Sequence, residues 1–87
     1  MKMADAELKA KVDKYLKKAK PLFEDLTIQQ PEKVDLKKAS SEFHEMALAY
    51  YRDALHFYEN GNYVNALAAL EYAEGWMDAG KRLGIFK

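Results

Sequence analysis

Residues 57–67 read FYENGNYVNAL, and this stretch decides the fold because an Asn-Gly-Asn turn separates two segments of helical periodicity. Between strands, Asn-Gly would indicate a β-hairpin. Here the apolar residues on both sides recur with a period near 3.6 rather than 2. We therefore expect Gly61 to end one helix in a left-handed conformation and Asn62 to begin the next. The turn predicts two antiparallel helices joined in a tight hairpin.

The same periodicity extends in both directions from the turn. Apolar residues keep steps of three and four through residues 36–57 and again through residues 66–77, and Gly84 marks a stop. Near the N-terminus, residues 8–26 carry a further amphipathic pattern, in which Pro21 removes a backbone donor and is expected to kink the helix. The irregular segment 27–35 is the predicted connection.

These patterns predict an all-α fold with one domain over residues 1–87. Because the connections are short, the economical arrangement is a closed three-helix bundle in up-down-up order. The predicted helices cover about residues 5–26, 36–60 and 62–83, and the last two form the hairpin.

Composition excludes several kinds of site. The 87 residues, 49% hydrophobic and 32% charged, suffice for one modest core, and the chain has no cysteine. Disulfides, thiolate metal sites and a cysteine nucleophile are therefore excluded. No apolar run reaches the roughly 18 residues of a membrane span, and the first residues lack the apolar core of a signal peptide. We expect a cytoplasmic protein without membrane contact.

Lysines are concentrated in the first helix although the formal net charge is zero. Residues 1–20 hold seven lysines against three acidic residues. Such a helix offers weak nucleic-acid binding as one hypothesis. Without arginines among the lysines, and without a basic balance in the whole chain, a solvated helix face is the better interpretation, and we expect nucleic acid to be an unlikely partner.

The second and third helices carry more apolar surface than a peripheral helix needs. Each has a second row of apolar and aromatic residues beside its main stripe. Either the first helix covers both rows, or part of this surface is left for a second copy or another protein. The rows consist of Leu48, Tyr51, Leu55 and Tyr58 in one helix and Ala69, Tyr72, Trp76 and Leu83 in the other.

A glycine in the middle of the third helix suggests close packing there. Gly75 costs about 1 kcal/mol relative to alanine, so we expect a neighbouring backbone or ring to need its space. Together with the second rows, this defines a candidate interface or packing seam, which comprises Tyr51, Leu55, Tyr58, Tyr72, Gly75, Trp76 and Ala79.

Four polar residues are candidates for burial or pairing. Asp53 falls in the three-four register of its helix and is expected at a core edge, where a carboxylate needs a partner. Arg52 is expected to form a salt bridge with Glu71, which lies at the same level across the hairpin. Asp78 is expected to be a surface charge balanced by Lys81 and its neighbour. None of these forms a catalytic, cofactor-binding or metal-binding pattern.

The segment AYYRDALHFYENGNYVNALAALEYAEGWMDAGKRLG, residues 49–84, resembles an archaeal family known as domain of unknown function 357. The resemblance implies a closed three-helix up-and-down bundle and an archaeal, cytoplasmic origin, and it implies no activity. Its signature positions here are Tyr51, Asp53, Ala54, Phe57, Gly61, Tyr72, Ala73, Gly75, Trp76, Asp78, Ala79 and Gly80.

The leading functional hypothesis is a non-enzymatic module for protein interaction or self-association, with no cofactor. It rests on the surplus aromatic surface and on the lack of catalytic motifs. The alternative is an accessory domain that binds a small ligand or nucleotide and works with an enzyme. In that case Asp53, Tyr72, Trp76 and Asp78 would line its pocket.

Overall fold

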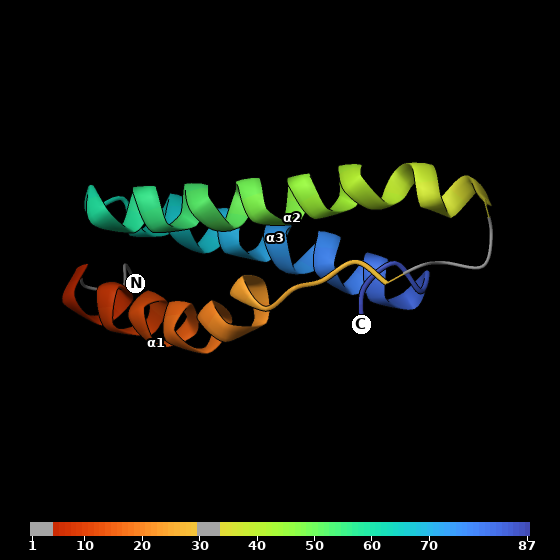
Figure 1. Cartoon of the computed structure of the whole chain (residues 1–87). Helices are drawn as coiled ribbons and strands as arrows, with labels where there is room; N and C mark the ends of the chain where they lie inside the picture. The colour runs from red at the N-terminus through yellow and green to blue at the C-terminus, as the bar shows by residue number, and fades with distance from the viewer. Residues whose placement is uncertain (1–4, 30–33) are drawn as a thin grey trace.

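The computed structural model describes residues 5–29 and 34–87 of the chain. It contains three helices, α1 (Asp5–Glu24), α2 (Val34–Glu59) and α3 (Tyr63–Arg82), which run up, down and up along one long axis (Figure 1). The predicted all-α three-helix bundle is confirmed, and the observed helix ends lie close to the predicted ones. The predicted connection at residues 27–35 lies partly outside the described residues.

Helix α1 continues through its proline. Pro21 lies inside the helix, which ends at Glu24, and the amide of Asp25 still donates to the Pro21 carbonyl over 3.1 Å. Proline removes one backbone donor, and near a helix end this loss affects little of the hydrogen-bond ladder. A final tight turn, in which the Leu26 amide donates to the Phe23 carbonyl, brings the buried Leu26 onto the core.

The turn between α2 and α3 forms as the sequence predicts. Gly61 has φ of +76°, the left-handed conformation that favours glycine. The Gly61 amide donates to the Tyr58 carbonyl, and the Asn62 amide donates to the Phe57 carbonyl over 2.8 Å. These two bonds are the Schellman arrangement that closes a helix C-terminus. The chain therefore reverses within the three residues 60–62, which brings α2 and α3 together along their length.

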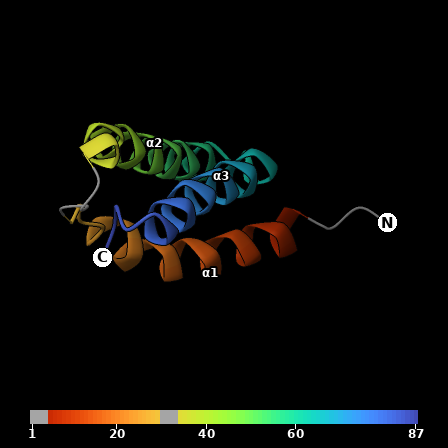
Figure 2. The same ribbon diagram turned by 90° about the vertical axis from the view of Figure 1, so that its right-hand side faces the viewer.

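Small residues fill the contact between α2 and α3. Ala47 and Ala54 of α2 and Ala66 and Ala73 of α3 are completely buried, which allows the two backbones to approach closely. Helix α1 lies along one side of this hairpin (Figure 2). Its buried side chains are one apolar stripe at helical spacing, namely Val12, Leu16, Ala19 and Phe23.

The segment after α3 is part of the core, which the sequence patterns did not predict. Gly84 has φ of +78°, and the Ile85 amide donates to the Gly80 carbonyl over 2.7 Å, so α3 ends in a second Schellman arrangement. This reversal turns the tail inward, where Ile85 is 0% and Phe86 2% exposed. Gly80 is required at this point because a Cβ there would overlap the Phe86 ring.

The tail also pairs with the segment that follows α1. Ile28 and Phe86 form an isolated antiparallel bridge, and the Gln29 amide donates to the Ile85 carbonyl over 2.8 Å. The side-chain amide of Gln29 donates to the Gly84 carbonyl over 2.8 Å. The two segments lie side by side at one end of the bundle (Figure 1).

In the described part of the chain, no helix is long and apolar enough to cross a lipid bilayer.

Candidate functional site

Aromatic side chains line the flank of the α2–α3 hairpin that lies away from α1. Tyr50 of α2 stacks on Tyr72 of α3, with ring centroids 5.2 Å apart and planes inclined by 23°. Two turns along, Phe43 meets Trp76 edge to face, with centroids 5.1 Å apart and planes at 87°. Both arrangements are favoured geometries for aromatic pairs. They hold the aromatic rings in a fixed row across the two helices.

An apolar groove of about 350 Å³ lies beside this row, open to solvent along one side. We call it the aromatic groove. Tyr72 is 63% exposed, whereas Phe43, Trp76 and Ala79 are half-buried. The residues that line the groove come from α2 and α3, and they are Phe43, Glu71, Tyr72, Gly75, Trp76 and Ala79.

Gly75 is exposed and has open space above it, contrary to the expectation that a neighbouring group needs its room. No atom outside its local helix lies within 4 Å of where its Cβ would stand. The glycine therefore leaves a gap in the helix surface at the floor of the aromatic groove. A ring that needs the space of a glycine is found instead at Gly80, where the Phe86 ring of the tail packs.

The second apolar row of α2 packs against α1, unlike the exposed Tyr72 in the second row of α3. Tyr51 is buried and stacks on Phe23 of α1, with centroids 4.8 Å apart and planes inclined by 10°. Leu55 and Tyr58 are half-buried on the same side of α2. Helix α1 therefore covers the row on α2. It does not cover the exposed Tyr72 of α3.

A small polar cluster ties α1 to α2. The Tyr58 hydroxyl donates to Asp13 Oδ1 over 3.0 Å, and Lys17 Nζ lies 3.1 Å from Asp13 Oδ2. The hydrogen bonds from Lys17 and from Tyr58 hold the pKa of Asp13 below its ordinary value of 3.8. The bond to Asp13 and partial burial raise the pKa of Tyr58 above 10.0. Burial, with a smaller contribution from the charge of Glu24, raises the pKa of Tyr51.

The predicted salt bridge between Arg52 and Glu71 is not formed. Within residues 5–29 and 34–87, the structure contains the Asp13–Lys17 ion pair and no other. Arg52 borders a groove between α1 and α2, whereas Glu71 borders the aromatic groove. The two residues line no groove in common. Asp78 is exposed, as expected of a surface charge, although it too has no ion pair among the described residues.

Asp53 is exposed, so its expected place at a core edge is wrong. The buried apolar residues of α2 are Ala47, Tyr51 and Ala54, one step away from the register that contains Asp53. Phe43 of that register lines the aromatic groove. Asp53 does not line the groove and is exposed to solvent.

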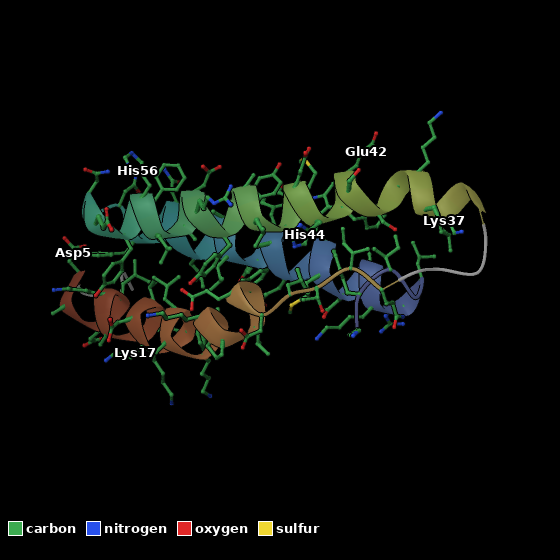
Figure 3. The ribbon with its side chains drawn as sticks, in the orientation of Figure 1. Asp5, Lys17, Lys37, Glu42, His44 and His56 are labelled. Carbon is green, nitrogen blue, oxygen red and sulfur yellow. The ribbon has the colours of Figure 1, made fainter. Side chains whose placement is uncertain are left out.

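The groove between α1 and α2 encloses about 420 Å³ and has a mixed character. Apolar residues of both helices line it together with His44, Arg52 and Glu24. His44 lies on the inner side of α2 (Figure 3), where its Nε2–H donates to the Leu26 carbonyl over 2.9 Å. His44 thus fixes the end of α1, which is a structural role.

Sequence reasoning missed two members of the exposed row. Phe43 and Tyr50 were assigned to the main core stripe of α2, but they pair with Trp76 and Tyr72 on the outer flank. The signal that could have found them is that Phe43 and Tyr50 lie seven residues apart, two helical turns, so that their side chains share one face of α2. Tyr72 and Trp76, four residues apart, likewise share one face of α3.

Among the residues that the structure describes, no three histidine, aspartate or glutamate side chains are placed to hold a metal ion.

Comparison with known proteins gives one match, to a family model. Neither a curated protein nor a solved structure matches the chain. A family model does match residues 14–86, which span most of α1, both other helices and the tail. The chain therefore belongs to the family described as "Protein of unknown function (DUF357)".

Proposed function

We propose that the protein is a non-enzymatic interaction domain that binds another protein in the aromatic groove. The observation that carries the proposal is that the exposed Tyr72 and the half-buried Trp76 lie beside the open floor at Gly75. Tyrosine and tryptophan are enriched at protein interfaces because each combines a large apolar body with a polar tip. A glycine that no packing contact requires is also accounted for, because a partner side chain can enter the space above it.

A protein partner fits this groove better than a small ligand does. Ligand sites are usually concave, with a few convergent polar groups that orient the ligand. The aromatic groove is open along its length, and Glu71 is the charged residue on its lining. Asp53 and Asp78, which the small-ligand hypothesis placed in the pocket, do not line it.

Capture of partners from the native lysate, compared between groove variants, tests the proposal. In Gly75→Leu an apolar side chain is added at a position where a Cβ meets no atom within 4 Å, and in Tyr72→Glu a charge is placed on the exposed wall. Leu22→Glu is the matched control, because Leu22 is an exposed apolar residue of α1, outside the groove.

The expected result is a partner that binds the wild type and the Leu22 variant but is lost from both groove variants. Circular dichroism and thermal unfolding verify that the variants remain folded. If the folded groove variants retain every partner that the wild type captures, the groove is not the binding surface and the proposal is wrong.

A further inference from the structure

We infer that the aromatic groove receives a basic amphipathic helix of a different protein. This inference rests on the proposed function and adds the chemistry of the partner. It is carried by the distribution of charge on both sides of the groove, together with the groove's length.

Carboxylates border the groove on both helices. In α2, Glu42 and Asp53 are exposed and fall on one strip, because residues 42, 46, 49 and 53 follow steps of four, three and four. Glu42 extends away from the other two helices (Figure 3). This strip lies beside the face of α2 that carries Phe43, which lines the groove, and Tyr50, which stacks on Tyr72.

On α3, a strip of residues with the same spacing forms the opposite border of the groove. Glu71, Gly75, Asp78 and Arg82 recur at steps of four, three and four, so Glu71 and Asp78 flank the open floor at Gly75. Both carboxylates are exposed, and Arg82 lies at the end of the strip. An apolar floor between two acidic borders is complementary to a helix with an apolar stripe and lysine or arginine on each side of it.

The carboxylates of α3 are close enough to affect one another. Burial, followed by the charges of Asp78 and Glu71, raises the pKa of Glu74 above its ordinary value of 4.5. The unbound surface therefore holds negative charges that repel each other. Cations of a bound partner would relieve this repulsion.

The length of the groove fits a short helical stripe. On α3 the lining residues Tyr72 and Ala79 lie seven residues apart, which is about 10 Å along a helix. Three apolar side chains at positions i, i+3 or i+4, and i+7 of a partner helix cover the same distance. Its central side chain would meet the gap above Gly75.

A second copy of this chain is a poorer occupant. A two-fold arrangement through the groove would bring the same surface of both copies together. The acidic borders of one copy would then lie against the acidic borders of the other, and like charges across an interface oppose association.

The sole tryptophan of the chain, Trp76, lines the groove and reports its occupancy by fluorescence. The probe is a synthetic 18-residue peptide without tryptophan, with leucine at i, i+3, i+4 and i+7 spacing and lysine at the other positions. A matched peptide carries glutamate in place of lysine. We expect the lysine peptide to shift the Trp76 emission in a saturable way and to bind at least tenfold more tightly than the glutamate peptide.

Charge and groove variants then locate the binding. Asp53→Asn and Asp78→Asn should each weaken the lysine peptide about two- to fivefold, as expected for exposed ion pairs. Glu24→Gln, which neutralises an exposed carboxylate of α1, should leave it unchanged. Gly75→Leu should abolish the Trp76 response. Raising the salt concentration should weaken binding in the wild type more than in the two asparagine variants.

The possible results separate the two proposals. If both peptides bind equally, or if Glu24→Gln weakens the lysine peptide as much as Asp53→Asn does, the basic partner is wrong, while loss of captured partners in Gly75→Leu would still support an interaction groove. A dimer of the free protein by sedimentation that Gly75→Leu dissociates would show that the occupant is a second copy. If neither peptide affects Trp76 and the groove variants lose no partner, both proposals fail.

Discussion

Replacement of Gly80 by alanine tests the packing of the C-terminal tail. An added Cβ would overlap the ring of Phe86, which is 2% exposed, so the ring must leave its place. Full burial of a phenylalanine side chain contributes about 1.5–3 kcal/mol. Alanine in a helix regains about 1 kcal/mol relative to glycine. We therefore predict that Gly80→Ala lowers the free energy of unfolding by about 0.5–2 kcal/mol.

Gly75→Ala is the matched control, because it makes the same chemical change in the same helix. Its Cβ meets no atom within 4 Å, so the gain in helix propensity is not offset by a clash. We expect an increase of about 1 kcal/mol in the free energy of unfolding, which raises the Tm of a domain of this size by roughly 4–8 °C. Gly75→Ala should therefore raise the free energy of unfolding, whereas Gly80→Ala should lower it.

Urea unfolding followed by circular dichroism measures both changes. Hydrogen exchange at the Gln29 amide, which donates to the Ile85 carbonyl, reports the tail directly and should become faster in Gly80→Ala. If Gly80→Ala is as stable as Gly75→Ala and the Gln29 amide stays protected, Phe86 does not occupy the site against Gly80 and the reasoning is refuted.

Three further predictions concern the tail and the ionisable groups. Removal of residues 85–87 deletes two buried side chains and should lower the free energy of unfolding by about 3–6 kcal/mol. The loss should appear as a large decrease in Tm, and an unchanged Tm would contradict the packing of the tail. Because the folded-state pKa of Asp13 is lowered, its contribution to stability is present above pH 3.8 and is lost as the pH falls through that lowered pKa. Tyr58→Phe should move the pKa of Asp13 back towards 3.8 in an NMR titration, and no movement would exclude the bond. The raised pKa of Glu74 has the opposite effect on the pH dependence of stability. Its contribution to stability is present below pH 4.5 and is lost as the pH rises through the folded-state pKa. Glu74→Gln should therefore raise the Tm at pH 7 but not at pH 3, and an equal effect at both pH values would show that charge is not the cause.

The helices were predictable because their signals are local. Apolar spacing sets each helix, and Gly61 and Gly84 adopt the left-handed conformations that end α2 and α3. The tail was not predictable in the same way, because residues 85–87 are too few to show a period. Gly84 was therefore interpreted as a stop, although its hydrogen bonds redirect Ile85 into the core.

The candidate site was predictable in part. Tyr72, Gly75 and Trp76 were assigned to a candidate seam, and they do line one groove. Tyr51 was assigned to the same group but packs on α1, because the side of the hairpin on which α1 lies depends on the handedness of the bundle. Two apolar rows on a helix do not reveal which of them an additional helix covers, and this choice also decides where Asp53 lies.

The pairing of the tail with the segment after α1 has a consequence for the order of folding. The α2–α3 hairpin closes through a three-residue turn, so its chain-closure entropy is small. The bond from Gln29 to Gly84 joins residues 55 positions apart, and contacts of such separation form late. We expect the hairpin to form first, with its aromatic flank already assembled, and α1 and the tail to dock together afterwards. The groove would then exist before the bundle is complete, so a helical partner could engage the chain during folding as well as after it.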